Sequence, residues 1–529
     1  MKDAQKYING LSYNRTAGIL MPVFSLPSKY GIGDLGSSAY KFIDLLKQSN
    51  QSLWAVLPMG HTGYCNSPYK SVSAFAGNPY FISPDILVQK KLITIKELKK
   101  YDFSNKSDKI DYGNLFDKRY QLLHEVFSNW KSQKINQTSN FKQFKKENKF
   151  WLSDYTLFMS LKEHFNFRPW NEWPQEIANY DKNAKIKYKK KLHHNIAFWE
   201  FVQFEYHNQL KQLKAYANFN GINLVGDMPF YVEYDSVDVW ANRDIFAINN
   251  KTNKIELYAG VPGDIFSKLS RNWGMPCYNW KNIAKTKYKW HLERFKQYTK
   301  QYNIIRVDHA IGFIRYYGIS DDNEQWYEGP DYKKEVLIPE ITKLMQKNSI
   351  ELIAEDLGSV PERAYYLFNK YNWSGTRVLQ FGFANKYGTE TIHLPFYYPH
   401  KSVAYSSTHD NPTLLSYINN MNKSNMPYLK YYLNSNKSVS LHKIQEKMIE
   451  SLYRSASEKV IIPLADILEF DNEARISHGK DYEKSWRWQL KSYREITKNK
   501  KEWLKKITFA YARTPFSIKQ GQDYGWNWQ

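Results

Sequence analysis

The feature that most constrains this chain is a series of short apolar runs, each followed sooner or later by residues with helical spacing. Several of these runs end in polar or charged residues. We interpret the runs as eight strands, at residues 17–21, 52–58, 223–229, 304–308, 351–356, 377–381, 402–410 and 460–464. Strands that alternate with helices form a parallel sheet, and eight such units predict the α/β class and a closed (β/α)8 TIM barrel. In such barrels the functional residues lie at the C-terminal ends of the strands.

Three helices are predicted around these strands. Residues 39–48 place Phe42, Leu45 and Leu46 on one helical face, and residues 332–347 predict a helix before the fifth strand. After that strand, Ser359 and Glu362 have the spacing of a capping box, which predicts a helix that begins there.

The second and third predicted strands are separated by far more residues than one crossover needs. Residues 109–130, 151–165 and 195–217 within this stretch have helical periodicity. We therefore expect a single catalytic barrel domain over residues 1–529, with a helical subdomain inserted over residues 94–217.

Charged residues end the fourth predicted strand, where IIRVDH places Arg306 and Asp308 two positions apart. Residues two apart in a strand share a face, so the guanidinium should lie beside the carboxylate. An adjacent positive charge favours ionised aspartate, as a carboxylate nucleophile requires. A purely structural ion pair is the alternative.

Acidic residues also follow other predicted strands. Glu355 ends the fifth, and two carboxylates from neighbouring strands, about 5 to 5.5 Å apart, are the arrangement of retaining glycosidases. Asp410 follows the seventh strand and Asp227 the third, and His309 and His409 stand beside two of the acids. The alternatives are a helix cap for Glu355, a helix-start residue for Asp410 and a turn residue for Asp227. Three or four acids at strand ends nevertheless favour one shared site.

The net charge of +23 raises the possibility of a nucleic-acid partner. The lysine runs at residues 185–194 and 498–506 lie apart, and no DNA- or RNA-binding motif accompanies them, so we interpret them as solvated helix faces. Aromatic residues make up 17% of the chain, which suits a sugar ligand, although packing in the core explains most of them.

The first residues contain no apolar signal region, and nowhere do about 18 apolar residues run together as a membrane span needs. We expect a cytoplasmic protein without membrane contact. Cys65 and Cys277 stand alone, so neither a disulfide framework nor a zinc site is predicted.

A set of longer motifs spans nearly the whole chain. The most distinctive are RTAGILMPVFSLPSKYGIGDLG (15–36) and QSLWAVLPMGHTGYCNSPYKSVSAFAGNP (51–79), followed in order by GDMPFYVEYDSVDVW, AGVPGDIFSKLSRNWGMPCYNW, RVDH, AEDLG, STHDN and IPLADIL. Together they resemble the 4-α-glucanotransferases of glycoside hydrolase family 77, the amylomaltases or disproportionating enzymes, within the α-amylase clan.

The resemblance implies a role for each candidate. Asp308 would be the nucleophile, Glu355 the general acid/base, and Asp410 the carboxylate that binds the 2- and 3-hydroxyls of the sugar. The implied substrate-binding residues are Ser67, Tyr69, Asp227, Asp264, Trp273, Arg306, His309 and His409. For Tyr69 and Trp273, packing within a loop is the alternative.

The implied function is transfer of α-1,4-glucan segments to the 4-hydroxyl of an acceptor glucan or glucose, through a covalent intermediate and without metal or organic cofactor. Malto-oligosaccharides would be both donor and acceptor. The alternatives are an α-1,4-glucan hydrolase of the same clan, an inactive glucan-binding protein and a nucleic-acid binder.

The chain departs from the family pattern in three places. Arg271 stands where the family has a glutamine, Cys65 and Asn66 replace a common Gly-Asp, and residues 473–486 lack the usual Asn-x-Pro-Gly. These departures bear on acceptor preference and on the ratio of transfer to hydrolysis.

Overall fold

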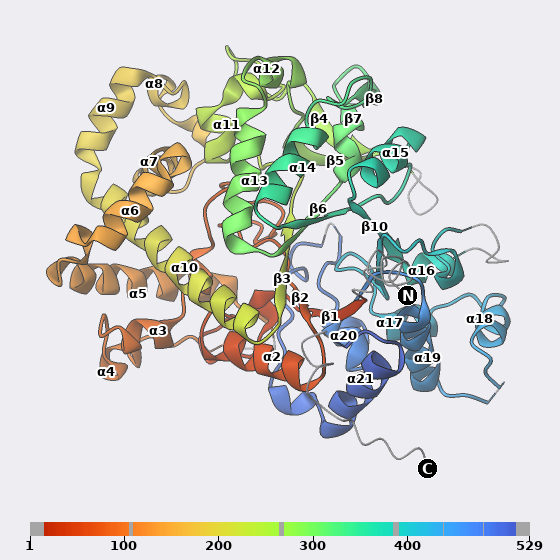
Figure 1. Cartoon of the computed structure of the whole chain (residues 1–529). Coiled ribbons are helices and arrows are strands. Elements are labelled where there is room, and N and C mark those ends of the chain that lie inside the picture. The colour runs from red at the N-terminus through yellow and green to blue at the C-terminus, as the bar shows by residue number, and fades with distance from the viewer. Residues whose placement is uncertain are drawn as a thin grey trace, which may run out of the picture.

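A closed barrel of eight parallel strands forms the centre of the molecule in this computed structural model, which describes residues 15–104, 109–263, 269–384, 391–436, 438–479 and 481–514 (Figure 1). Around the barrel the strand order is β1-β12-β11-β10-β9-β6-β3-β2. The strands are β1 (Thr16–Leu20), β2 (Leu53–Ala55), β3 (Asn223–Met228), β6 (Ile304–Val307), β9 (Glu351–Ala354), β10 (Ser374–Val378), β11 (Ser402–Tyr405) and β12 (Lys459–Pro463). The predicted fold class is confirmed, and each of the eight predicted runs contains or overlaps one barrel strand.

The side chains of the strands alternate between the inside of the barrel and its outer surface. Ile304 belongs to the small apolar cluster inside the barrel, whereas Ile305 and Val307 belong to the large cluster shared with the surrounding helices. Along β6, therefore, Ile304 and Arg306 face inward. The inner cluster contains Leu53, Ala55, Val225, Ile304, Ile353, Val403, Tyr405 and Ile461.

Some predicted boundaries are wrong. The strand expected at residues 377–381 ends at Val378, and the residues after it form the short helix α16 (Leu379–Gly382). The helix expected over residues 332–347 begins only at Ile338. Asp331 explains the late start, because its carboxylate accepts hydrogen bonds from the backbone N–H groups of residues 336–338 and holds the preceding turn. Pro339 then suits the first helical turn, where its missing N–H costs nothing.

The capping box predicted for Ser359 and Glu362 is also wrong. The helix α15 (Glu362–Lys370) has Pro361 at its N-cap, with no side-chain hydrogen bond to the cap. Pro361 supplies the extended conformation that precedes a helix, which leaves Ser359 two residues too early to cap it. The carbonyl of Ser359 instead accepts a hydrogen bond from Arg315.

A second sheet, which the sequence analysis did not predict, lies beside the barrel. It is antiparallel, with the order β5-β4-β7-β8. Its strands are β4 (Tyr258–Val261), β5 (Arg271–Pro276), β7 (Arg315–Ile319) and β8 (Glu324–Glu328). The segments before and after β6 therefore supply this sheet.

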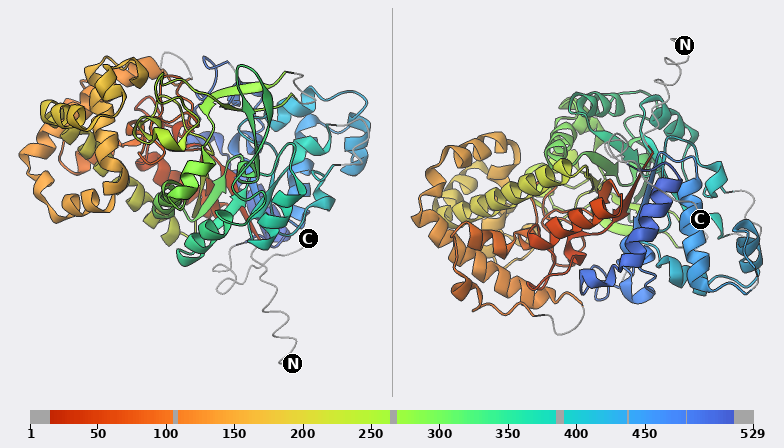
Figure 2. Two further views of the ribbon diagram at one scale, coloured as in Figure 1. Left: turned by 90° about the horizontal axis from the view of Figure 1, so that it is seen from above. Right: turned by 60° about the horizontal axis from the view of Figure 1, so that its bottom comes forward.

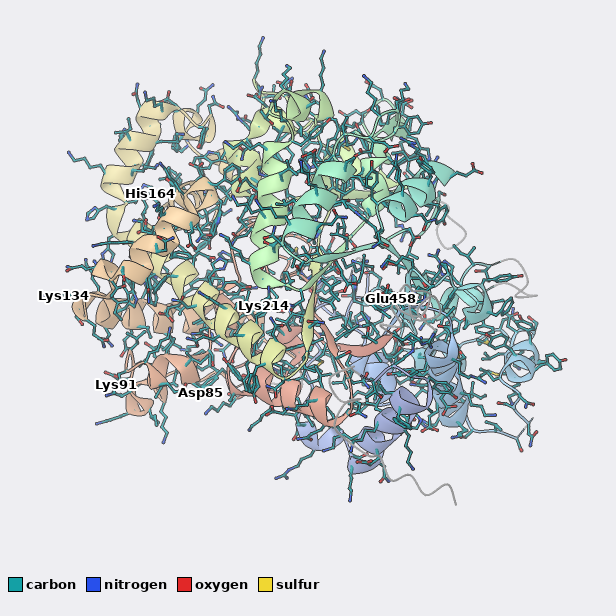
Figure 3. All side chains as sticks on the ribbon, in the orientation of Figure 1. Asp85, Lys91, Lys134, His164, Lys214 and Glu458 are labelled. Atoms are coloured by element: carbon teal, nitrogen blue, oxygen red, sulfur yellow. The ribbon has the colours of Figure 1, made fainter. Side chains whose placement is uncertain are left out.

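Between β2 and β3 the described chain is helical and lies to one side of the barrel (orange and yellow in Figures 1 and 2). Its helices are α3 (Pro84–Gln89), α4 (Ile95–Leu98), α5 (Tyr112–Ser132), α6 (Ser139–Glu147), α7 (Lys149–His164), α8 (Gln175–Ala178), α9 (Lys182–Lys191) and α10 (His193–Phe219). Lys214 of α10 donates to the carbonyls of Thr299 and Tyr302, near the C-terminal end of a barrel helix (Figure 3). Whether residues 94–217 form a separate subdomain stays a prediction.

The remaining helices surround the barrel or lie on the connections between its strands. They are α2 (Ser37–Gln48), α11 (Val237–Ala241), α12 (Trp280–Lys285), α13 (Lys289–Gln301), α14 (Ile338–Lys347), α17 (Leu414–Asn419), α18 (Met426–Tyr432), α19 (Leu441–Arg454), α20 (Leu464–Ile467) and α21 (Lys498–Ala510), in addition to α15 and α16. Among the described helices, none combines the length and the apolar composition that crossing a membrane requires.

A buried arginine joins the chain segments at the N-terminal ends of the strands where the barrel closes. Arg513, which is fully buried, donates to the carbonyls of Thr16, Ser457 and Glu458 at distances of 2.9 to 3.3 Å. It also donates to two carbonyls at the end of α19. Since β1 and β12 start at Thr16 and Lys459, this one side chain ties together the two strands that close the barrel.

Candidate active site

An arginine at the C-terminal end of β6 gathers three carboxylates at the mouth of the barrel. Nη1 of Arg306 donates to both carboxylate oxygens of Asp227, at 2.6 and 2.8 Å, and to Oδ1 of Asp308 at 2.9 Å. Nη2 of Arg306 lies 3.8 Å from Oε2 of Glu355. The predicted shared face of Arg306 and Asp308 is confirmed, and both the ion pair and the convergence of the acids follow from it.

The backbone ladder sets the spacing of Asp308 and Glu355. Strands β6 and β9 are neighbours in register, with Val307 paired to Ala354, so the two acids follow paired residues. The backbone N–H of Glu355 donates to the carbonyl of Val307 at 3.0 Å, which extends the ladder by one step. Neighbouring strands lie about 4.8 Å apart, so the two acidic residues leave the sheet at about that separation.

Glu355 is not a helix cap, which was the alternative. Its Oε2 accepts a hydrogen bond of 2.5 Å from the backbone N–H of His309. His309 has a left-handed backbone, with φ 45° and ψ 43°, and this turn directs its N–H toward β9. The strained turn after β6 therefore positions the carboxylate at the end of the next strand.

Tyr69 connects the loop after β2 to the acidic cluster. Its hydroxyl donates to Oδ2 of Asp227 at 2.7 Å, and its ring stacks on His409 with centroids 4.9 Å apart. Nε2 of His409 lies 3.4 Å from Oδ2 of Asp410. The side chain of Asp410 is 69% exposed, which places it at the rim of the site and not at its base.

Trp273 of β5 forms an aromatic wall of the site, next to His309. Its ring lies 5.1 Å from the ring of His309, edge to face, and 5.8 Å from that of Tyr231. Burial lowers the pKa of His309 to about 4, so its imidazole is neutral near pH 7. Its Nε2 is buried and has no hydrogen-bond partner among the described residues.

The helical insertion supports the loop that carries Ser67 and Tyr69. The hydroxyl of Ser67 accepts from the backbone N–H of Tyr69, so here it stabilises the turn. Further along this loop, Gln203 of α10 accepts from the N–H of Gly77 at 2.8 Å and donates to its carbonyl at 2.9 Å. The imidazole of His61 is hydrogen-bonded to the hydroxyls of Tyr155 and Tyr120, which belong to the insertion.

Of the predicted site residues, Asp264 lies outside the described residues, and the others fall into two groups. The structure brings together Tyr69, Asp227, Trp273, Arg306, Asp308, His309, Glu355, His409 and Asp410. Ser67 lies on the same loop without a hydrogen bond to the acidic cluster among the described residues. Arg271 begins β5 and is exposed, and its effect on acceptors stays a prediction.

The sequence analysis missed three residues of this site. Trp486 lies 6.0 Å from Tyr69 and 6.1 Å from His409, ring to ring. Arg475 holds the rim, because it donates to the carbonyl of Asp410 at 3.0 Å. Tyr231 completes the wall formed by Trp273. The first two belong to the segment of residues 473–486, which departs from the family pattern, and that departure is the only signal that the sequence contained.

Burial and the charge of Arg306 shift the pKa values of the two central carboxyls, Asp308 and Glu355. Burial raises the pKa of Asp308, and the charge of Arg306 opposes this rise. Burial likewise raises the pKa of Glu355, again opposed by Arg306 and by the hydrogen bond from His309. Arg306 contacts Asp308 at 2.9 Å but Glu355 only at 3.8 Å, so its charge favours the ionised form of Asp308 more than that of Glu355.

Within the described part of the chain, no three His, Cys, Asp or Glu side chains are grouped to hold a metal ion. Three carboxylates, an arginine, a neutral histidine and aromatic walls at the mouth of a (β/α)8 barrel define a class of protein, the carboxylate-based enzymes that act on glycosidic bonds.

Comparisons with known proteins identify the family within this class. The family model described as 4-alpha-glucanotransferase matches residues 21–497. A 4-alpha-glucanotransferase of Clostridium butyricum is 36% identical over 483 residues, which cover 89% of this chain and 95% of that protein. One from Aquifex aeolicus is 35% identical over 506 residues and 94% of this chain, and 99% of that protein is covered.

A solved structure agrees with these matches. An amylomaltase from Streptococcus agalactiae in complex with acarbose has a TM-score of 0.88 and 31% identity, with 95% of this chain and 100% of that chain covered. An amylomaltase of Corynebacterium glutamicum, at 14% identity and a TM-score of 0.71, shares the fold. The chain belongs to the 4-alpha-glucanotransferase family, glycoside hydrolase family 77.

Proposed function

We propose that this protein is a 4-α-glucanotransferase that moves α-1,4-glucan segments from one malto-oligosaccharide to the 4-hydroxyl of another, or of glucose. Family membership over residues 21–497 supports the reaction type. The observation that carries the proposal is the pair of in-register acids, Asp308 and Glu355, of which only Asp308 is in hydrogen-bond contact with Arg306.

The first step uses the two acids in different protonation states. Ionised Asp308 attacks C1 of the donor glucose, and the bond between C1 and the glycosidic oxygen breaks. Glu355 gives its proton to that oxygen, and the reducing-end fragment leaves as an alcohol. The glycosyl group remains as an ester on Asp308.

The second step reverses these roles. Glu355, now ionised, takes the proton from the 4-hydroxyl of the acceptor, whose oxygen attacks C1 and displaces Asp308. Two inversions give net retention. The backbones of the two acids lie about one strand separation apart, which favours the short carboxyl spacing of retaining enzymes over the spacing of about 6.5 to 9.5 Å that inverting enzymes need.

The remaining residues of the site would bind sugar. Asp410, at the rim, would bind the 2- and 3-hydroxyls of the donor glucose. Tyr69 and Trp273 supply aromatic rings to the site, and His309 lies against the ring of Trp273. Transfer further requires that a glucan acceptor compete with water, so acceptor contacts at this mouth must supply binding energy.

The alternative function, α-1,4-glucan hydrolysis, uses the same first step with water as acceptor. Incubation of the protein with maltotriose separates the two. We expect glucose together with oligosaccharides longer than three units by chromatography, while the concentration of reducing ends stays nearly constant. A steady rise in reducing ends without longer products would favour the hydrolase.

A variant identifies the nucleophile in the same assay. Asp308→Asn should lower the rate at least about a thousandfold, because an amide cannot form the glycosyl ester. Circular dichroism should report an unchanged fold. Near-normal transfer by a correctly folded Asp308→Asn protein would remove Asp308 from this role. The cytoplasmic location stays a prediction.

A further inference from the structure

Five aromatic side chains form an exposed surface on the connections that follow β10 and β11. Phe396, Tyr397 and Tyr431 are 62%, 53% and 86% exposed, and Tyr428 and Tyr432 are half-buried beside them. We call these five residues the aromatic patch. Rings of this size, clustered and open to solvent, commonly mark a binding surface.

Ring contacts join the two segments of the patch. The centroid of Phe396 lies 4.2 Å from that of Tyr397 and 6.3 Å from that of Tyr432. Tyr428, Tyr431 and Tyr432 have the i, i+3, i+4 spacing of one face of α18, which Figure 1 shows at the outer edge of the molecule. Phe396 therefore joins Tyr397 to Tyr432 of α18, and Tyr428 and Tyr431 extend the patch along that helix.

Buried neighbours hold both segments in place. Leu394 and Tyr398, which flank Phe396 and Tyr397, are buried, and Tyr398 donates to the carbonyl of His393 at 2.7 Å. Under α18, the buried ring of Phe383 contacts Tyr428 and Tyr432 with centroids 5.9 and 5.4 Å away. A ligand that binds here pays little for ordering the protein, because the rings are already positioned.

The patch is connected to the mouth of the barrel where the candidate active site lies. Nδ1 of His393 accepts a hydrogen bond from the N–H of Val378, the last residue of β10. From α16, Gln380 donates to the carbonyl of Pro412, two residues after Asp410, at 2.9 Å. The same framework thus supports the patch and the rim of the site.

We propose that the aromatic patch is a second binding surface for α-1,4-glucan, on which one part of a long chain rests while another part occupies the active site. The inference rests on the proposed function, which supplies the ligand class. None of the five members is charged, and four are tyrosines, so the surface offers ring faces and hydroxyls together. Glucose units present the matching combination of C–H faces and hydroxyl edges.

A second surface changes how substrate length affects the enzyme. A long chain bound at one point has a raised effective concentration at the other, whereas a short oligosaccharide reaches only one. The double variant Phe396→Ala/Tyr397→Ala should therefore raise KM for amylose by about five- to tenfold and leave kcat/KM for maltotriose unchanged. Phe219→Ala, which removes a still more exposed ring (87%) at the end of α10, is the control and should change neither value.

Binding is measured directly by electrophoresis through native gels that contain soluble amylose. We expect the amylose to retard the wild-type protein and Phe219→Ala, and to retard the double variant and Tyr431→Ala much less. Equal retardation of wild type and patch variants, or none of the wild type, would overturn the proposal. A wild-type dimer that light scattering finds dissociated in the double variant would also overturn it, by assigning the patch to a second copy.

The two proposals fail separately. Retardation requires no turnover, so retardation that depends on the patch without any transfer from maltotriose would keep the second surface and reject the proposed reaction. Transfer from maltotriose with unchanged amylose kinetics in the double variant would keep the proposed reaction and reject the second surface.

Discussion

At the scale of single residues, Tyr69 connects more parts of the site than any of its neighbours on the loop. Its hydroxyl binds Asp227, and its ring stacks on His409. Tyr69→Phe keeps the ring and removes the hydroxyl, which leaves Asp227 with one hydrogen bond fewer. A hydrogen bond to a charged group contributes about 1.5 to 3 kcal/mol, so we expect kcat/KM for maltotriose to fall about tenfold or more.

Tyr64→Phe is the control for this prediction. Tyr64 lies in the same loop and is fully exposed, so loss of its hydroxyl should leave kcat/KM unchanged. An equal effect of the two substitutions would show that the loop in general, and not the contact between Tyr69 and Asp227, determines the rate.

The pH dependence of the reaction follows from the carboxyl pair. Burial raises the pKa of Glu355 above its usual 4.5. In the proposed role of general acid Glu355 must be protonated, so activity should be lost as pH rises through that raised pKa. Asp308 must be ionised, so activity is also lost as pH falls. We expect a bell-shaped profile of kcat/KM whose alkaline limb lies above pH 4.5. An alkaline limb at or below pH 4.5 would contradict the raised pKa.

Predictions for single residues succeeded where the backbone geometry determines the direction of the side chain. The two-residue repeat of a strand was enough to place Arg306 beside Asp308. No such repeat governs Arg475 or Trp486, which reach the site from a loop. Their positions depend on how that loop folds over the barrel, and a local pattern in the sequence does not encode this.

At the scale of elements, helix α10 determines the position of the loop that carries Tyr69. Gln203 satisfies both backbone groups of Gly77, and a Cβ at Gly77 would lie 1.9 Å from the ring of Tyr206. Gln203→Met should leave the N–H and C=O of Gly77 buried without partners. We expect a loss of about 2 to 4 kcal/mol in the free energy of unfolding, measured in urea.

Gln212→Met tests whether the helix itself is responsible. Gln212 is exposed on the same helix, so the identical substitution should change stability by less than about 0.5 kcal/mol. If both variants lost the same stability, the contact with Gly77 would not be the cause. KM for maltotriose should rise in Gln203→Met alone, since Tyr69 loses its support.

The elements were predictable to different degrees. Seven of the eight barrel strands appeared in the sequence as largely apolar runs, because both faces of such a strand are buried, whereas β10 (SGTRV) was overlapped only at its end. The antiparallel sheet did not, since β8 is largely exposed and β5 contains Gly274 and Pro276. The start of α14 was misplaced because Asp331 stabilises a turn that helical periodicity does not reveal.

At the scale of the whole molecule, one side chain completes the closure of the barrel. Arg513 satisfies carbonyls that precede β12 and the first carbonyl of β1. Arg513→Met would remove one donor from each of these carbonyls, although the carbonyl of Glu458 keeps the backbone N–H of Thr16. We expect a loss of about 3 kcal/mol or more in the free energy of unfolding and a lower Tm, with unchanged KM because the site is at the opposite end of the strands.

Arg494→Met is the matched substitution, because Arg494 is exposed and its loss should change Tm little. If both substitutions lowered Tm equally, the cause would be the loss of a positive charge and not the loss of the Arg513 hydrogen bonds. A higher KM in Arg513→Met would mean that closure of the barrel also shapes its mouth.

The register between β6 and β9 has a consequence for redesign. Main-chain hydrogen bonds, which no side-chain substitution removes, set the distance between Asp308 and Glu355. The walls around them, in contrast, come from loops and from the antiparallel sheet. Exchanging these walls would alter which chain lengths enter, while the anomeric configuration of every product would remain the same.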